Sequence, residues 1–157
     1  MYNQHMRFTP ARAIALADIS VETLRYWKKF VPCLADKRGH APCYTRAEIV
    51  GLIVVRQLVR DFKMDVSALL AQSETLFGLC AIQWTRPSRR ILCVSSNGYV
   101  TAHDGLVGLD LSKPAIVFPL DLAVNELERR LNEQESQPQL ELALPLVPFN
   151  TRLRNAL

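Results

Sequence analysis

The clearest chemical pattern in the sequence is a set of charged and aromatic residues at helical spacing. Four of them stand at positions i, i+3, i+4 and i+7, so a helix would place them on one face: Glu22, Arg25, Tyr26 and Lys29. Leu24 and Trp27 would point the opposite way, toward a core. A guanidinium can donate paired hydrogen bonds to a phosphate. The pattern therefore favours a helix that binds a polyanion.

The residues around this helix complete a candidate DNA-binding site. If the helix lies in the major groove, its first residues meet base edges; these are Ser20, Val21, Glu22 and Thr23. We expect the later positions to contact phosphates: Arg25, Tyr26, Lys28 and Lys29. The loop that follows could reach phosphates or the minor groove through Lys37, Arg38 and His40. The expected partner is double-stranded DNA, with no cofactor and no metal.

Two sequence strings in this region resemble the DNA-binding head of the MerR family of bacterial transcription regulators. The first is Thr23-Leu24-Arg25-Tyr26-Trp27, preceded by Ala17 and Ser20, and the second is Tyr44-Thr45-Arg46-Ala47-Glu48-Ile49. The resemblance covers about the first 70 residues at domain scale. It implies a winged helix-turn-helix in which Arg25 and Tyr26 contact phosphates. It also implies that Thr45 and Glu48 cap the helix after the wing.

The chain departs from the family pattern at several positions. The turn between the first two helices has Asp18-Ile19 where the family has glycine, and Lys28 replaces an acidic residue. The end of the wing, Ala41–Tyr44, lacks the usual arginine. Pro87 and a hairpin signal follow too soon for the family's long dimerisation helix. The family's effector chemistry is therefore not transferred to this chain.

Helix and turn signals divide the chain into two structured parts and a tail. Helices are predicted over residues 10–17, 21–30, 46–62 and from 66 to about 80, with a loop or short hairpin over 31–44. Asn97-Gly98 predicts a β-hairpin, followed by a third strand over 115–118 and an amphipathic helix over 120–133. The predicted fold is a mainly α winged helix-turn-helix domain (1–84), a small α+β module (85–135) and a Pro/Leu-rich tail (136–157).

Charge is concentrated in the first part of the chain. The 157 residues carry a net charge of +4, and residues 1–65 carry 11 basic against 6 acidic side chains. An uneven basic half suggests a polyanionic partner. No apolar stretch is long enough for a membrane span, and the four cysteines lack paired spacing, so a reducing cytoplasm is expected.

Two other clusters could suggest a different chemistry. Cys33, His40 and Cys43 include zinc-ligand types, but no fourth ligand is near, and buried small cysteines are the favoured interpretation. The same holds for Cys80 and Cys93, which fall in apolar stretches. The pair His103-Asp104 has no nucleophile motif beside it, so we expect a turn and no enzyme.

The sequence therefore predicts a dimeric, sequence-specific transcription regulator of bacterial type. An alternative uses the same head in a DNA-binding accessory protein: an antitoxin or autorepressor, an excisionase, or a partition or phage-packaging component. Its C-terminal part would then bind a protein partner. A small-ligand sensor and a protein-interaction module without DNA binding also remain open.

Overall fold

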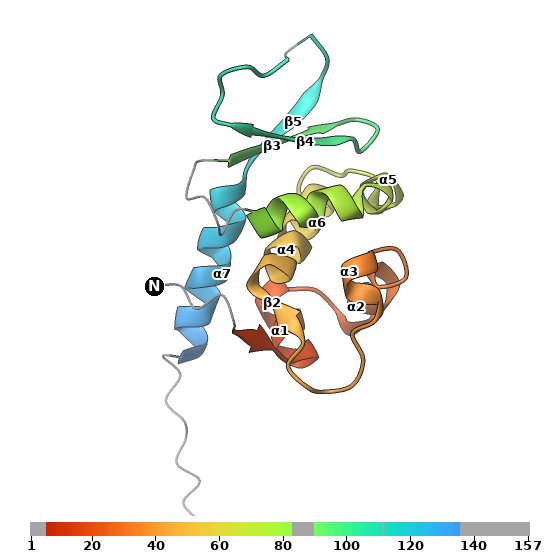
Figure 1. Cartoon of the computed structure of the whole chain (residues 1–157), viewed down its shortest axis with the longest axis vertical. Coiled ribbons are helices and arrows are strands. Elements are labelled where there is room, and N and C mark those ends of the chain that lie inside the picture. The colour runs from red at the N-terminus through yellow and green to blue at the C-terminus, as the bar shows by residue number, and fades with distance from the viewer. Residues whose placement is uncertain (1–5, 83–89, 111, 136–157) are drawn as a thin grey trace, which may run out of the picture.

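The computed structural model describes residues 6–82, 90–110 and 112–135, which form a mixed α/β fold. The first part is mainly helical, and a three-stranded sheet and a long helix follow it (Figure 1). The elements in chain order are β1 (Arg7–Phe8), α1 (Pro10–Ala17), α2 (Val21–Trp27), α3 (Pro32–Ala35), β2 (Tyr44–Thr45), α4 (Arg46–Arg60), α5 (Val66–Ala71), α6 (Ser73–Ile82), β3 (Arg90–Ser95), β4 (Val100–Asp104), β5 (Ala115–Pro119) and α7 (Leu120–Glu135).

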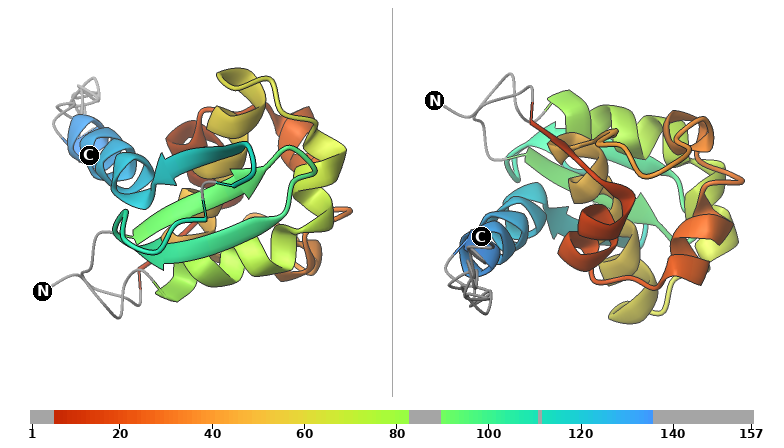
Figure 2. Two further views of the ribbon diagram at one scale, coloured as in Figure 1. Left: turned by 90° about the horizontal axis from the view of Figure 1, so that it is seen from above. Right: turned by 90° about the horizontal axis from the view of Figure 1, so that it is seen from below.

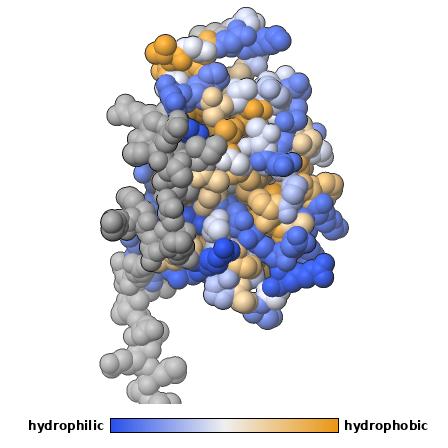
Figure 3. Space-filling view, in the orientation of Figure 1, coloured by the Kyte–Doolittle hydropathy of each residue, from blue (hydrophilic) through white to orange (hydrophobic). Residues whose placement is uncertain are grey.

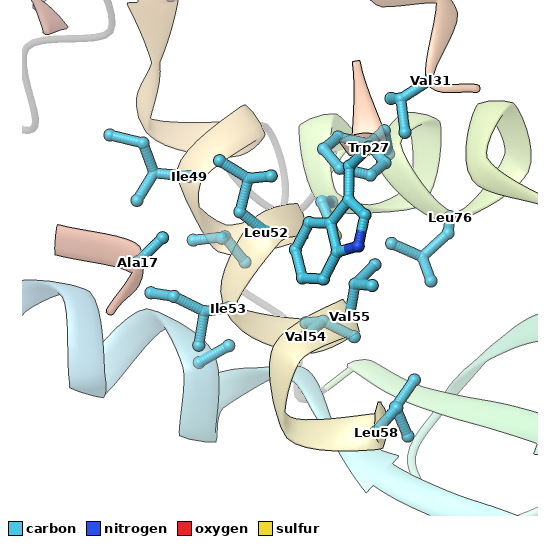
Figure 4. Close-up of a cluster of buried hydrophobic side chains, with 14 of the residues drawn as sticks. Ala17, Trp27, Val31, Ile49, Leu52, Ile53, Val54, Val55, Leu58 and Leu76 are labelled. Carbon is cyan, nitrogen blue, oxygen red and sulfur yellow. The ribbon is translucent and has the colours of Figure 1, made fainter. Parts of the chain in front are cut away.

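Helix α4 is the central element of the core. Thr45 caps it: its hydroxyl accepts a hydrogen bond from the Glu48 amide (3.2 Å), and the Glu48 carboxylate accepts one from the Thr45 amide (2.8 Å). This reciprocal cap confirms the prediction from the sequence. Every residue from Ile49 to Arg56 is buried, as expected for a helix that is apolar nearly all round. Helices α1, α6 and α7 all pack on it, and Figure 4 shows part of the resulting cluster.

The C-terminal sheet has the strand order β4-β3-β5, with both pairs antiparallel. Leu92 in the central strand is paired with Ala102 on one side and Phe118 on the other. Leu92 and Phe118 are buried on the face that meets the helices. The hairpin between β3 and β4 confirms the Asn97-Gly98 signal, and Figure 2 shows the sheet lying across the helical part.

Helix α7 joins the two parts of the chain. Its buried residues, Leu120, Ala123, Leu127 and Leu131, belong to the same hydrophobic cluster as those of α1 and α4. The predicted apolar stripe on this helix therefore packs within the chain. The predicted boundary at 84–85 and the predicted tail at 136–157 lie outside the described residues.

Helix α2 is shorter than predicted. It ends at Trp27. The backbone amides of Lys29 and Phe30 donate hydrogen bonds to carbonyl oxygens three residues back, which is a tighter turn than an α-helix. Pro32 favours an extended backbone at the residue before it, and Val31 has φ −101° and ψ 105°, so no helix can continue through Val31. Lys29 therefore lies beyond the helix, and it does not extend the helical face as the spacing implied.

The segment over 31–44 also differs from the predicted loop or hairpin. It contains the short helix α3, and its final strand β2 pairs with β1, upstream of α1, with Phe8 opposite Tyr44. Residues 36–43 form no strand. The partner of β2 is distant in sequence, and Phe8 and Tyr44 are both buried, so tertiary packing decides the pairing.

The fourth predicted helix is broken into α5 and α6. Gln72, with φ −105° and ψ 15°, interrupts it. The next residue, Ser73, is buried and donates its hydroxyl to the carbonyl of Phe30 (3.1 Å). This bond anchors the start of α6 to the segment after α2.

The cysteines follow the prediction only in part. Cys80 is buried, and burial raises the pKa of its thiol to about 12. Cys93 and Cys43 are half-buried, whereas Cys33 is exposed. Leu34 is the buried residue of the one-turn helix α3 that also contains Cys33. No helix in the described ranges combines the length and apolar character needed to cross a membrane.

Candidate nucleic-acid interface

The turn between α1 and α2 sets how α2 is presented. Asp18 ends α1 in the left-handed region, with φ 55° and ψ 52°. Asparagine and aspartate are the non-glycine residues that adopt this conformation most readily, so the turn forms with Asp18 and needs no glycine. Ser20 then caps α2 by accepting a hydrogen bond from the Thr23 amide (3.0 Å). Only Asp18, Ile19 and Ser20 separate the two helices.

One face of α2 is buried and the other is free, as predicted. Leu24 and Trp27 are each 4% exposed, and Figure 4 shows Trp27 inserted into the cluster beside Leu52, Val55 and Leu76. On the other side, Glu22 and Arg25 are exposed. The buried face holds the helix in place, so the exposed face has a fixed orientation.

Tyr26, a predicted phosphate contact, lies near the end of α2. It is 41% exposed, and its ring meets that of Phe30 edge to face, with centroids 5.1 Å apart. The two rings border a hollow of about 300 Å³ that Leu70 and Ala71 also line. Figure 3 shows apolar surface in this area, where α5 and α6 lie above α2 and α3. The Tyr26 side chain is therefore accessible, next to the predicted phosphate contacts.

Most basic side chains of the first part have partners within the chain. They bind carbonyl, amide or carboxylate oxygens; the residues are Arg7, Arg12, Lys28, Lys37, Arg46, Arg56 and Arg60. Within the described ranges, four others have no ion pair or side-chain hydrogen bond: Arg25, Lys29, Arg38 and Lys63. Three of these four, Arg25, Lys29 and Arg38, lie on α2 or between α2 and β2. The unpartnered charge is thus concentrated at the predicted site.

Two of the predicted DNA-contacting residues are engaged inside the protein. The Lys37 side chain is 13% exposed, and its ammonium lies 2.9 Å from a Glu48 carboxylate oxygen and 2.6 Å from the Cys43 carbonyl oxygen. Lys28 donates to the carbonyl of Lys37. Lys37 therefore joins the loop over 36–43 to the cap of α4. Arg38 and His40, in the same loop, are exposed.

A groove of about 230 Å³ lies between α1, α2 and this loop. Apolar side chains from the two helices line it together with cationic ones from α2 and the loop. The lining residues include Pro10, Ile14, Val21, Leu24, Arg25, Lys28, Lys37, Arg38 and Tyr44. The groove thus brings Arg25 and Lys28 of α2 together with Lys37 and Arg38 of the loop. Tyr26 borders the other hollow, and the remaining candidates do not line the groove: Ser20, Glu22, Thr23, Lys29 and His40.

A buried ion network, which the sequence reasoning missed, supports the α1–α2 turn from behind. Arg56 of α4 is 6% exposed, and both oxygens of Glu126 in α7 accept hydrogen bonds from it at 2.7 Å. Arg56 also pairs with Asp18 at 3.2 Å. Arg130 of α7 reaches Glu126 at 3.0 Å and Asp18 at 3.3 Å. The residue that shapes the turn is therefore tied to the C-terminal helix.

The arginines in this network control the ionisation of its carboxylates. Burial acts to raise the pKa of Glu126, but hydrogen bonding and charge from Arg56 outweigh it and hold the pKa below 4.5. Burial likewise opposes the shift at Asp18, where Arg130 and Arg56 lower the pKa from 3.8. Two sequence features mark members of the network: an arginine within an apolar helix and an aspartate in place of a turn glycine. Neither feature indicates which residues pair.

The other candidate chemistries gain no support from the fold. Over the ranges 6–82, 90–110 and 112–135, no three His, Cys, Asp or Glu side chains come together as metal ligands. His103 forms a hydrogen bond with Thr101 (3.1 Å).

Comparison of the chain with models of known protein families and with curated protein sequences gives no match.

Proposed function

We propose that this protein binds double-stranded DNA through α2 and acts as a sequence-specific transcription regulator with a MerR-like winged helix-turn-helix head. The observation that carries the proposal is the set of free cations around a fixed helix. Arg25, Lys29 and Arg38 are exposed and unpartnered among the described residues, whereas the opposite face of α2 is buried. Such a surface suits a phosphate backbone.

In this proposal α2 enters the major groove with its first turn nearest the bases. Glu22 and Thr23 face base edges, together with Ser20, whose hydroxyl lies 2.9 Å from that of Thr23. Arg25 and Tyr26 contact phosphates, and Arg38 reaches the backbone beside the groove. Lys28 and Lys37 support the site by holding the loop.

The regulator would act as a dimer. One short recognition helix supplies little specificity, and two half-sites about one helical turn apart multiply it. A protein partner on the C-terminal module is the alternative role for this part of the chain. The exposed loop after β4 supports it, since Leu106 is 69% and Val107 90% exposed.

The test is a fluorescence-anisotropy titration of the full chain with two duplexes of equal length. One comes from upstream of the protein's own gene and the other is unrelated. Arg25→Ala should weaken binding by about tenfold or more, the loss expected for one charged contact. Arg129→Ala is the matched control, because Arg129 is exposed on α7 and, among the described residues, pairs only with Glu133. Equal binding by both variants, or no binding by the native chain, would reject the proposal.

A further inference from the structure

An apolar side chain lies in the middle of the candidate DNA-binding surface. Val21, the first residue of α2, is 50% exposed, and the exposed charged residues Glu22 and Arg25 stand near it on the same helix. It takes no part in the helix cap, which Ser20 and Thr23 form. Val21 precedes Arg25 by one helical turn, so both side chains lie on the same face.

The groove beside Val21 combines hydrocarbon and positive charge. Ile14, Val21 and Leu24 supply apolar surface, and Arg25 and Arg38 supply guanidinium groups that have no partner in the described part of the chain. A matching ligand has an apolar group a few ångströms from anionic oxygens. The major groove of DNA offers this combination, because the C5-methyl of thymine is its apolar base-edge group and phosphates line its walls.

We infer that Val21 is a specificity-determining residue that reads thymine through its C5-methyl group. This inference rests on the proposed function and deepens it by naming one feature of the operator. A valine side chain has no hydrogen-bonding group, so its discrimination among bases must come from apolar contact. Arg25, one turn further along α2, fixes the register by holding a phosphate.

The experiment begins with selection of binding sites from random duplexes by the full-length protein. In the enriched duplex, each thymine is then replaced in turn by deoxyuridine, which pairs identically with adenine and lacks only the methyl group. We expect one thymine in each half-site at which the replacement weakens binding by about fourfold, the factor for burying one methyl-sized group. Val21→Ala should lose about the same factor, and deoxyuridine at that position should cost this variant nothing further.

A matched control is Leu122→Ala, which truncates another exposed apolar side chain, 55% exposed on α7. This variant should keep the full deoxyuridine effect. The inference is overturned if no thymine is sensitive, or if the sensitive thymine remains so in Val21→Ala. In both of those results the chain still binds DNA, so the proposed function stands. Failure to enrich any duplex would instead reject the proposed function, and the inference with it.

Discussion

Replacement of Glu126 by glutamine should destabilise the whole fold, because this carboxylate neutralises a buried arginine. Arg56 is 6% exposed and donates hydrogen bonds to both Glu126 oxygens at 2.7 Å. In Glu126→Gln the shape is kept and the charge is lost. Of the two carboxylates described beside the guanidinium, Asp18 then remains, and it is 47% exposed and lies 3.2 Å away.

The expected loss follows from the burial of the pair. Removing one partner of a fully buried ion pair costs roughly 3–5 kcal/mol. Glu126 is 14% exposed and Asp18 remains opposite Arg56, so we expect about 2–3 kcal/mol in the free energy of unfolding. For a chain of this size, such a loss lowers the melting temperature by roughly 5–10 °C.

Urea unfolding and thermal melting measure this change, and Glu133→Gln is the control. Glu133 lies on the same helix and pairs with Arg129, but both side chains are more than half exposed, at 59% and 57%. The control should lose about 0.5 kcal/mol or less. Equal losses in the two variants would refute the assignment of Arg56 and Glu126 as the stabilising pair.

The pair of Arg56 and Glu126 also makes the free energy of unfolding depend on pH, and the direction of this dependence follows from the pKa of Glu126. The pKa of Glu126 lies below 4.5 in the folded chain, so its contribution is fully present above that pH. It is lost as the pH falls through the folded pKa, because the unfolded chain then binds the proton more readily. The difference in stability between native chain and Glu126→Gln should therefore be constant near pH 7 and shrink below pH 4.5. A difference that grows on acidification would contradict this.

Two further predictions concern local structure, and urea unfolding of three variants measures the free energies. Thr45→Ala removes the cap of α4 and should cost about 1 kcal/mol; an unchanged midpoint would contradict the capping geometry. Gly98→Ala should cost more than Gly39→Ala, although both glycines have positive φ (82° and 79°). A methyl group at Gly98 would lie 2.6 Å from the carbonyl oxygen of Ala68, whereas nothing lies within 4 Å at Gly39. Both variants carry about 1–2 kcal/mol of backbone strain, so equal losses would show that the close approach is absent.

Features governed by short-range signals could be predicted from the sequence. Ser20 as the cap of α2, the reciprocal cap of Thr45 and Glu48, and the Asn97-Gly98 hairpin all depend on residues a few positions apart. Pro32 also shows that α2 cannot continue through Val31, but it does not indicate the tighter turn over residues 28–30. The helical spacing of Lys29 was therefore misleading.

Features that depend on distant residues could not be predicted in this way. Asp18 and Arg56 are 38 positions apart, and Arg56 and Glu126 are 70 apart. The sequence shows which residues are basic, but it does not show which of them pair with a carboxylate in the folded chain. Lys37 illustrates this, since its ammonium looked free for DNA in the sequence and is paired with Glu48 in the structure.

The central claim, that the exposed face of α2 binds phosphates, is tested most directly by the salt dependence of DNA binding. The logarithm of the binding constant is measured against the logarithm of salt concentration for the native chain and for Arg25→Ala. If Arg25 neutralises one phosphate, the slope should become less steep by about 0.9, whatever the DNA sequence. The same slope for both proteins, with Arg129→Ala as control, would show that Arg25 meets no phosphate and would contradict the claim.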